Sequence, residues 1–145
     1  MRNREKWDKR FLDLAKTVSN WSKDQSTKVG AVIVDNRNII LGLGYNGFPR
    51  NINDNIQERN QRPNKYKFTI HAEENAILNS NQSNLINSTL YCTFFPCPNC
   101  MCKIINVAIS RVVTIENTLY NKRWEEDFKI SKEMAIEAGI ELTLY

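Results

Sequence analysis

The sequence predicts an α/β fold, namely a three-layer α/β/α sandwich around a five-stranded mixed sheet. Short runs rich in β-branched residues alternate with longer runs whose apolar residues recur every three or four positions, which indicates strands alternating with amphipathic helices. The chain has 145 residues, 41% of them hydrophobic, which is the size of one domain with a substantial core. We therefore expect residues 1–145 to form a single domain.

The first half of the chain predicts a helix followed by a hairpin. An amphipathic helix is predicted over residues 6–20, where apolar residues follow helical spacing. These residues are Trp7, Phe11, Leu14, Ala15 and Val18. The β-rich runs 29–35 and 39–45 are joined by a short polar segment, which favours an antiparallel pair. Residues 46–70 contain two prolines and little periodicity, so we expect a long loop that borders the functional site.

The second half of the chain predicts alternating helices and strands. In chain order we expect a helix at about 71–80, a strand at 89–93, a helix at about 98–109, a strand at 111–115, a helix at 124–138 and a strand at 139–145. Gly139 is the expected C-cap of the last helix. Because a helix separates strands 4 and 5, we expect these two strands to be parallel, joined by a right-handed crossover.

Composition narrows the classes of protein to consider. The chain has no apolar run near 18 residues, and its first segment, MRNREKWDKR, is charged, so we expect neither a membrane span nor a secretory signal. All four cysteines fall within residues 92–102, a spacing more typical of metal or redox chemistry than of a disulfide framework. We expect a cytoplasmic protein in a reducing compartment. The net charge of +4 suits an anionic small molecule and a nucleic acid equally well.

Two short segments have the residues of a metal site. The only histidine of the chain lies in HAEENAI, residues 71–77, and a Cys-x-x-Cys pair lies in PCPNC, residues 96–100. Each segment comes where a strand or loop gives way to a helix, so the two helix N-termini can face each other. A catalytic zinc takes three protein ligands and leaves one position for water. We predict one catalytic Zn²⁺ bound by His71, Cys97 and Cys100, with the helix dipole favouring the thiolates.

Other roles explain these residues less well. A closed structural zinc site needs four ligands, but the chain has no second Cys-x-x-Cys and no second histidine. A redox pair of cysteines would give His71 and Glu73 no role. Cys102 lies two positions after Cys100 and therefore about 200° around the helix, away from the metal. We expect Cys102 and Cys92 to be small buried hydrophobic residues rather than ligands.

Glu73 lies two residues after the histidine, where its carboxylate can reach a water on the metal. His-x-Glu combined with Pro-Cys-x-x-Cys is the pattern of zinc-dependent deaminases. In that chemistry Glu73 passes a proton from the water to the ring nitrogen, and the hydroxide attacks the amine-bearing carbon. Glu73 then delivers a proton to the exocyclic amine, which leaves as ammonia. Glu74 points about 100° away on the helix, so we expect it to be a surface or interface charge.

Five segments together point to a known family. They are SKDQSTKVGAVIV (22–34), GYNGFPR (44–50), HAEENAI (71–77), LYCTFFPCPNC (90–100) and AGIEL (138–142). Over nearly the whole chain the sequence resembles the deoxycytidylate (dCMP) deaminases, and the first two segments have most of the specificity. The resemblance implies a cytidine deaminase-like fold and zinc-dependent hydrolysis of dCMP to dUMP, which feeds thymidylate synthesis. It also implies a homo-oligomer, commonly a hexamer, that dCTP activates and dTTP inhibits.

The resemblance assigns roles to individual residues. Asn46 matches an asparagine that contacts the sugar and base, and Ala72 matches a residue whose backbone meets the pyrimidine. Effector contacts are implied at Gly44, Tyr45, Gly47 and Phe48. For the phosphate, the residues offer cations and hydroxyls on two loops, at Lys23, Ser26, Thr27, Lys28, Tyr120, Lys122 and Arg123. Each of these phosphate candidates is equally typical of a solvated loop. Asn46 is also typical of a turn.

The sequence lacks one feature of some family members and departs from the family pattern at one position. Some members bind a second, structural zinc within the long loop, but residues 46–70 contain no Cys or His, so we expect one zinc per subunit. Glu74 stands where an apolar residue is usual.

Two alternatives to a dCMP deaminase stay open. A nucleic-acid deaminase of the tRNA adenosine type would share the zinc core, although basic residues here are interleaved with acidic ones, as in REKWDKR. A non-catalytic nucleotide-sensing domain would have no use for Glu73. We expect a small-molecule nucleotide as substrate and neither a nucleic acid nor a membrane as partner.

Overall fold

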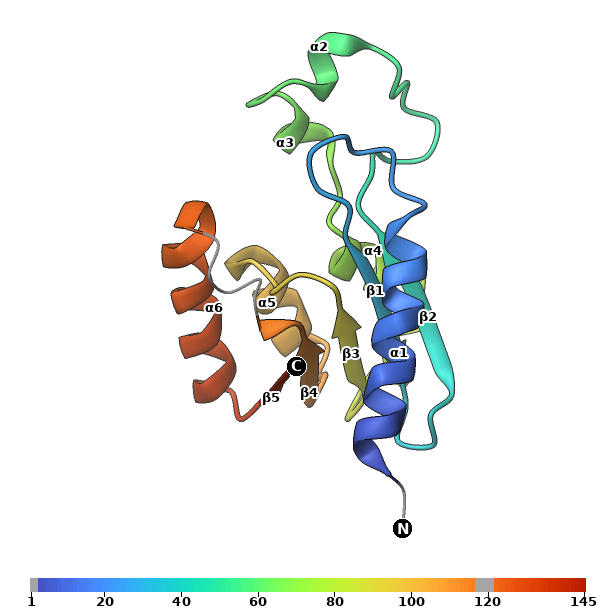
Figure 1. The fold of residues 1–145 in the computed structure, drawn as a ribbon, viewed down its shortest axis with the longest axis vertical. Helices are drawn as coiled ribbons and strands as arrows, with labels where there is room; N and C mark the ends of the chain where they lie inside the picture. The colour runs from blue at the N-terminus through green and yellow to red at the C-terminus, as the bar shows by residue number, and fades with distance from the viewer. Residues whose placement is uncertain (1–2, 117–121) are drawn as a thin grey trace.

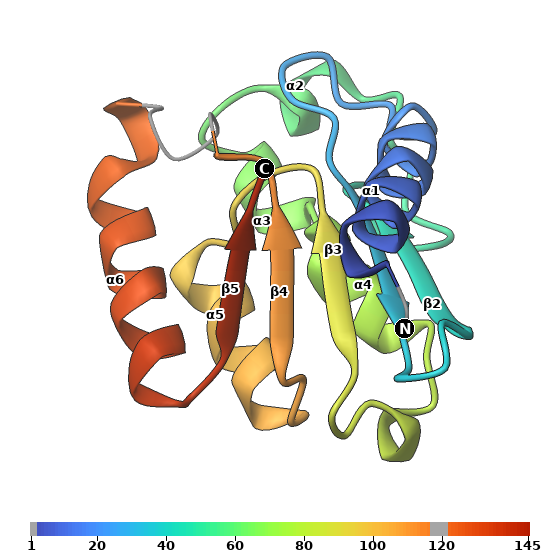
Figure 2. The same ribbon diagram turned by 60° about the horizontal axis from the view of Figure 1, so that its bottom comes forward.

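The computed structural model describes residues 3–116 and 122–145, which form a five-stranded sheet with helices on both faces (Figure 1). The strands are β1 (Gly30–Val34), β2 (Ile40–Tyr45), β3 (Thr89–Cys92), β4 (Arg111–Thr114) and β5 (Glu141–Leu144). Their order in the sheet is β2-β1-β3-β4-β5 (Figure 2). β1 pairs antiparallel with β2 and with β3, whereas β3, β4 and β5 run parallel. The predicted mixed sheet, hairpin and parallel pairing of strands 4 and 5 are confirmed.

Helices cover both faces of this sheet, which confirms the three-layer sandwich. α1 (Arg4–Ser19) packs its apolar stripe on one face, in a cluster with Val32 and Tyr91. α4 (Ala72–Leu78), α5 (Pro98–Asn106) and α6 (Glu125–Glu137) share a second cluster with Ile33 and Leu90 on the other face. Neighbouring strand residues point to opposite faces, which is why Val32 and Ile33 belong to different clusters. Within the described ranges, no helix is long and apolar enough to cross a membrane.

Local backbone features decide where the helices begin and end. α1 begins earlier than predicted because the Asn3 side chain accepts a hydrogen bond from the Lys6 amide at 3.1 Å. α5 ends earlier than predicted, and Ala108 takes a positive φ of 65° shortly after it. Gly139 has a φ of 77° just beyond α6, a conformation that favours glycine. The predicted glycine at the end of this helix is therefore confirmed.

The segment 46–70 is mostly loop, as predicted. It holds two short helices, α2 (Gln57–Asn60) and α3 (Lys65–Phe68). An antiparallel bridge between Gly47 and Ile70 closes its base, and the rings of Phe48 and Phe68 stack with their centroids 5.4 Å apart. Elsewhere, 3₁₀ turns occur at η1 (Gln82–Asn84) and at η3 (Lys122–Trp124), the latter just before α6. The loop is thus an organised part of the molecule.

Glycines in β2 bring α4 close to the sheet. A Cβ on Gly44 would collide with the Ala72 carbonyl oxygen, and a Cβ on Gly42 would collide with the carbonyl oxygen one turn further along α4. The side-chain amide of Asn75 donates a hydrogen bond to the Tyr45 carbonyl oxygen at 2.9 Å, which ties the same helix to the end of β2. The start of α4 is therefore held directly against a strand backbone.

A buried polar cluster joins α1 to the parallel half of the sheet. Asp8 is 1% exposed, and its two carboxylate oxygens accept hydrogen bonds from Arg111 at 2.7 and 2.6 Å. They also accept hydrogen bonds from the hydroxyls of Tyr91 at 2.8 Å and Tyr145 at 2.7 Å. Burial alone would raise the pKa of Asp8, but the hydrogen bonds and the positive charge of Arg111 outweigh it and lower that pKa below its usual 3.8.

Candidate active site

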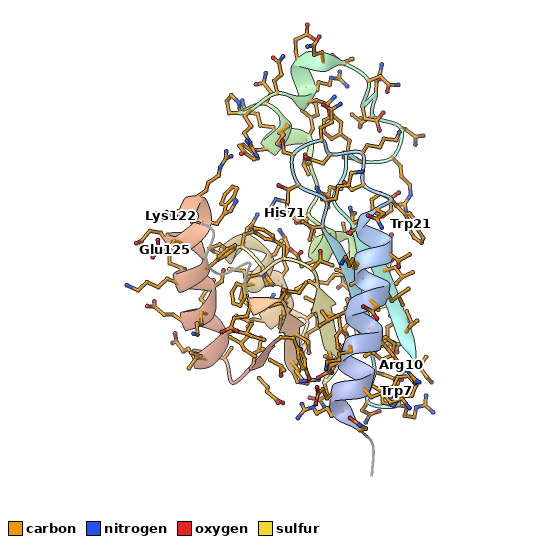
Figure 3. The ribbon with its side chains drawn as sticks, in the orientation of Figure 1. Trp7, Arg10, Trp21, His71, Lys122 and Glu125 are labelled. Atoms are coloured by element: carbon orange, nitrogen blue, oxygen red, sulfur yellow. The ribbon has the colours of Figure 1, made fainter. Side chains whose placement is uncertain are left out.

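The two predicted metal-binding segments do face each other. His71 is the N-cap residue of α4, Cys97 is the N-cap residue of α5, and Cys100 lies in the first turn of α5. His71 Nδ1 lies 3.4 Å from Cys97 Sγ and 3.3 Å from Cys100 Sγ. The ligand atoms of all three residues lie within 4.8 Å of one another. Figure 3 shows His71 near the centre of the molecule, below the segment that holds α2 and α3.

The chemistry of these three residues suits a divalent cation that prefers nitrogen and sulfur. A hydrogen bond from Cys100, together with His71, lowers the pKa of the Cys97 thiol to about 4 despite its burial. The pKa of Cys100 is raised, because a second thiolate beside Cys97 would be repelled and is also desolvated. A cation between the two sulfurs would remove that repulsion. Imidazole and two thiolates are the ligands of catalytic zinc sites with one open position.

Glu73 lies beside the three ligands and is only 4% exposed. Burial raises the pKa of its carboxyl to about 7, although the nearby His71 acts in the opposite direction. A carboxyl group with a pKa near neutrality can both accept and release a proton at physiological pH. Glu74, by contrast, is half-buried and forms an ion pair with Lys103 at 2.7 Å. The two adjacent glutamates therefore have different environments, as expected from their directions on the helix.

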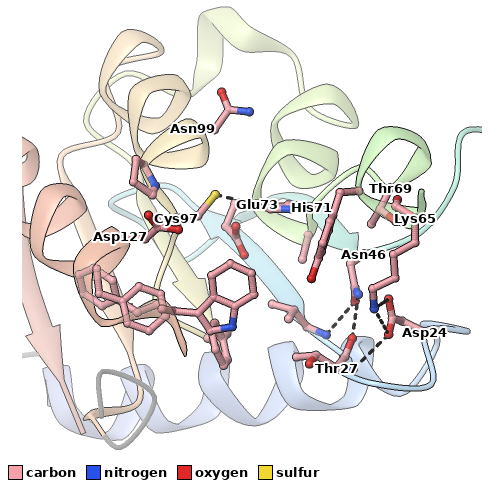
Figure 4. Close-up of a pocket in the computed structure, with 18 of the residues that line it drawn as sticks. Asp24, Thr27, Asn46, Lys65, Thr69, His71, Glu73, Cys97, Asn99 and Asp127 are labelled. Carbon is pink, nitrogen blue, oxygen red and sulfur yellow. Dashed lines mark hydrogen bonds and ion pairs between the residues drawn. The ribbon is translucent and has the colours of Figure 1, made fainter. Parts of the chain in front are cut away.

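A cavity of about 530 Å³ opens in front of these residues (Figure 4), a volume typical of small-molecule sites. One side is aromatic and is formed by Phe94, Phe95, Trp124 and Phe128. The long loop forms another side through Arg62, Lys65, Tyr66 and Thr69, which confirms that this loop borders the site. The lining is completed by His71, Cys97 and Glu73 and by Asp24, Thr27, Val29, Asn46, Ala72, Pro98, Asn99 and Asp127.

Of the residues predicted to bind substrate, three line the cavity: Asn46, Ala72 and Thr27. Asn46 is 7% exposed, and its amide accepts a hydrogen bond from the Val29 amide and donates one to the Thr27 carbonyl, both at 2.8 Å. An amide has a further proton and a further lone pair, so these bonds leave capacity for a ligand. Asn46 thereby also positions the Thr27 loop.

The other phosphate candidates lie elsewhere. The exposed Lys23 forms an ion pair with Asp54 at 3.0 Å, and neither it nor Ser26 and Lys28 belongs to the cavity lining. Tyr120 lies outside the described residues. The roles of these residues stay predictions.

The residues predicted to contact effectors surround a different hollow. Tyr45, Gly47 and Phe48 line a hollow of about 150 Å³ together with Trp21 and Lys23. Gly44 instead packs against α4, as described above. The hollow shares Asp24, Asn46 and Thr69 with the main cavity. The effector role of these positions stays a prediction.

Sequence reasoning missed several residues of the cavity. Lys65, 8% exposed, forms an ion pair with Asp24 at 3.2 Å, and this pair joins α3 to the loop before β1. Tyr66 was not predicted either, and its hydroxyl accepts a hydrogen bond at 2.7 Å from Arg123 Nη2, one of the predicted phosphate residues. These contacts join positions far apart in the chain and leave no periodic signal. The helical spacing of Trp124 and Phe128 is the one trace that could have indicated the aromatic side.

The prediction for one cysteine was wrong and for another was confirmed. Cys102 is exposed, not buried, because α5 turns that side away from the core, and its Sγ lies 3.9 Å from Met134 Sδ. Cys92 is buried within β3, as predicted. Neither residue belongs to the metal-binding group.

Comparison with known proteins agrees with this geometry. Residues 5–116 match the family model of the cytidine and deoxycytidylate deaminase zinc-binding region. The chain belongs to this deaminase family. Membership identifies zinc as the metal for which His71, Cys97 and Cys100 are positioned.

Individual members of the deaminase family are similar over most of the chain. The chain is 45% identical to an uncharacterized deaminase of Aliivibrio fischeri, over 95% of this chain and 92% of that protein. It is 34% identical to the deoxycytidylate deaminase of Mus musculus, over 79% of this chain and 67% of that protein. The dCMP deaminase of cyanophage S-TIM5, solved in complex with dCMP and dUMP, is 25% identical with a TM-score of 0.74, over 100% of this chain and 99% of that one.

Proposed function

We propose that this protein hydrolyses dCMP to dUMP and ammonia in the 530 Å³ cavity, with one zinc ion per chain. The observation that supports this most is the buried Glu73 carboxyl beside the group His71, Cys97 and Cys100, at the cavity wall. A deaminase needs a proton carrier at this place, whereas a structural metal site does not. The similarity to a cyanophage enzyme solved with dCMP and dUMP supports the choice of nucleotide.

In this mechanism Glu73 moves two protons. His71, Cys97 and Cys100 would hold a zinc ion, which would make a water acidic enough to act as a nucleophile at neutral pH. Glu73 accepts the proton of that water and passes it to N3 of the pyrimidine, which makes C4 more electrophilic. The oxygen of that water adds to C4, and Glu73 takes its second proton and delivers it to the exocyclic nitrogen. The C4–N bond then breaks, ammonia leaves and a carbonyl remains at C4. The raised pKa of Glu73, about 7, suits both directions of transfer.

The cavity lining supplies contacts for the rest of the nucleotide. The backbone at Ala72 and the amide of Asn46 would contact the base and sugar, and the aromatic side would cover the pyrimidine. For the phosphate we propose Thr27 and Arg62, which line the cavity, with Lys23, Ser26, Lys28 and Tyr120 as further candidates on nearby loops. The positive charge of Lys65 is compensated by Asp24, so this residue is more suited to holding the wall together.

The family resemblance supports two finer proposals. The protein would be a homohexamer in the cytoplasm, activated by dCTP and inhibited by dTTP at Gly44, Tyr45, Gly47 and Phe48. The small hollow lined by the last three residues adjoins the main cavity, which supports a coupling between the two. Light scattering of the purified protein and dCMP saturation curves with each effector test both points. A monomer without any effector response would contradict them.

The deaminase proposal is tested by substrate choice and metal content. The purified protein is expected to contain one zinc per chain and to release ammonia from dCMP faster than from CMP, deoxycytidine, dCTP or adenosine. Equal turnover of deoxycytidine and dCMP would contradict recognition of the phosphate. Tight, salt-sensitive binding of RNA would favour a nucleic-acid deaminase instead. Nucleotide binding without any turnover would favour a sensing domain.

A further inference from the structure

An ion pair joins the two helices that hold the zinc ligands. Lys103 Nζ, on α5, donates a hydrogen bond to Glu74 Oε2, on α4, at 2.7 Å. The same ammonium group lies 3.4 Å from Asn99 Oδ1, one turn back on α5 and at the cavity lining. Lys103 therefore connects α4 with the first turn of α5. The deamination mechanism uses neither residue of this pair.

The pair lies directly behind the ligands on both helices. Glu74 comes three residues after His71, and Lys103 comes three residues after Cys100. Residues three apart on a helix share a face. Glu74 and Lys103 therefore join α4 and α5 about one turn beyond the contact between His71 and Cys100. The two side chains are 27% and 39% exposed, so water screens their attraction less than that of a fully exposed pair.

Within the described residues, the Glu74–Lys103 pair is the one ion pair between α4 and α5, which also share a buried apolar cluster through Ala72 and Met101. α4 has only seven residues, and no side chain caps its first turn. Its contact with β2 sets its distance from the sheet but not its distance from α5. Since His71 lies on one helix and both cysteines on the other, any shift between the helices changes the distances between the ligands directly. A short ion pair across this gap resists that shift.

We infer that Glu74 and Lys103 are positioning residues that hold α4 and α5 at the separation zinc binding requires. The inference rests on the proposed zinc-dependent function but not on dCMP as the substrate. Groups behind metal ligands commonly change metal affinity by about ten- to a hundredfold, and this pair acts through the helices rather than on the ligand atoms. A smaller effect, about three- to tenfold, is therefore expected for its loss.

A different role for Lys103 gives the opposite result for Glu74. The positive charge of Lys103 could stabilise the two thiolates by itself, without Glu74. Removing the negative charge of Glu74 would then leave zinc affinity unchanged or increase it. If the pair positions the helices, removing either partner weakens zinc binding, and removing both costs no more than removing one.

The test compares Glu74→Gln, Lys103→Met and the double variant. Zinc affinity is measured on the purified full chain by competition with a coloured chelator. Each single variant is expected to bind zinc about three- to tenfold more weakly, and the double variant about equally weakly. Unchanged or tighter binding by Glu74→Gln, or additive losses in the double variant, would overturn the inference.

Controls separate positioning from general stability. The exposed pair Glu5 and Lys9, 2.6 Å apart on α1, carries the same charges far from the site, so Glu5→Gln with Lys9→Met should leave zinc affinity unchanged. Lys103→Arg keeps the pair and should retain affinity within about twofold. The visible spectrum of the Co²⁺-substituted protein reports ligand geometry and should change in Glu74→Gln but not in the α1 control. These readouts need no substrate, so a protein that bound zinc without deaminating dCMP would still decide the question.

Discussion

The two faces of the sheet each hold a cluster of charged and polar side chains, but the clusters are built in opposite ways. On the α1 face, Asp8 accepts four hydrogen bonds, two of them from Arg111, so negative and positive charge are matched. On the α4 and α5 face, Glu73 and two thiols converge on a single imidazole. The charges on the α1 face are balanced by residues of the chain, whereas the group on the α4 and α5 face is suited to binding a cation.

This difference shows in the pKa of the two buried carboxyls. Hydrogen bonds and Arg111 lower the pKa of Asp8, which means that its folded environment prefers the charged form. Burial without a matched partner raises the pKa of Glu73 to about 7. Asp8 therefore contributes to stability, whereas Glu73 reduces stability at neutral pH. Under the proposed function, this leaves a carboxyl that can exchange a proton at that pH. Four predictions test this contrast.

The largest expected effect is the loss of turnover in Glu73→Gln. Removing a positioned proton carrier typically slows a reaction by about 10²- to 10⁴-fold, and the amide cannot replace it. The variant should fold and retain zinc, because Glu73 is not among the metal-binding residues. Ammonia release from dCMP and zinc per chain are the measurements. Full activity in this variant would exclude Glu73 as the proton carrier.

The second prediction concerns Asp8→Ala, which breaks the matched cluster. Arg111 would keep a buried positive charge without its partner, and such a loss costs about 3 to 5 kcal/mol of the free energy of unfolding. Denaturant unfolding of the zinc-loaded protein measures this cost. The turnover of molecules that remain folded should be unchanged. Glu5→Gln, in the exposed α1 pair, is the control and should change stability by less than about 1 kcal/mol.

The third prediction is that the two carboxyls give opposite pH dependence. The pKa of Asp8 is lowered, so its contribution is present above the unfolded value of 3.8 and is lost as the pH falls through the lower folded pKa. The pKa of Glu73 is raised from 4.5 to about 7, so the zinc-free protein should lose stability as the pH rises through that window. The expected loss is on the order of 3 kcal/mol.

The free energy of unfolding of the zinc-free wild type and of Glu73→Gln, measured at pH 5 and at pH 8, tests the predicted loss of stability with rising pH. The wild type should lose more stability between these values than the variant, since glutamine does not titrate. Equal losses in the two proteins would show that another group causes the pH dependence.

The smallest expected effect is that of Cys102→Ser. Cys102 is exposed and lies outside the metal-binding group, so the change should alter stability by less than about 0.5 kcal/mol. Zinc content should remain at that of the wild type. Cys100→Ser is the matched change on the same helix and should lose zinc. Retention of zinc by both variants would mean that Cys100 is not a ligand.

Much of the fold and the metal-binding group could be predicted because their signals are local. Periodicity indicated the order of helices and strands, and the spacing of His71, Cys97 and Cys100 indicated the zinc ligands. Turn chemistry marked Gly139. Residues of this kind are determined by neighbours a few positions away, or by the strict geometry of a metal.

The remaining features depend on partners far along the chain. Asp8 and Arg111 are 103 positions apart, and nothing near either residue indicates the other. Lys65 lies in a segment that the sequence predicts to be a loop, but its side chain is buried and forms an ion pair with Asp24. Cysteine is usually buried, but Cys102 is exposed because it lies on the side of α5 that is turned away from the core. Such contacts become visible only when the elements are packed.

The close approach of α4 to β2 has a consequence for the precision of the site. At Gly44 the backbone of α4 lies directly against the backbone of β2, and at Gly42 the Ala76 carbonyl oxygen and the Ser80 side chain approach the strand as closely. Side chains exchange rotamers on fast timescales, whereas a main-chain contact has no rotamers to exchange. The histidine at the start of this helix is therefore positioned in part by a contact between two backbones. Among the segments that form the site, α4 is therefore held by a backbone contact with β2.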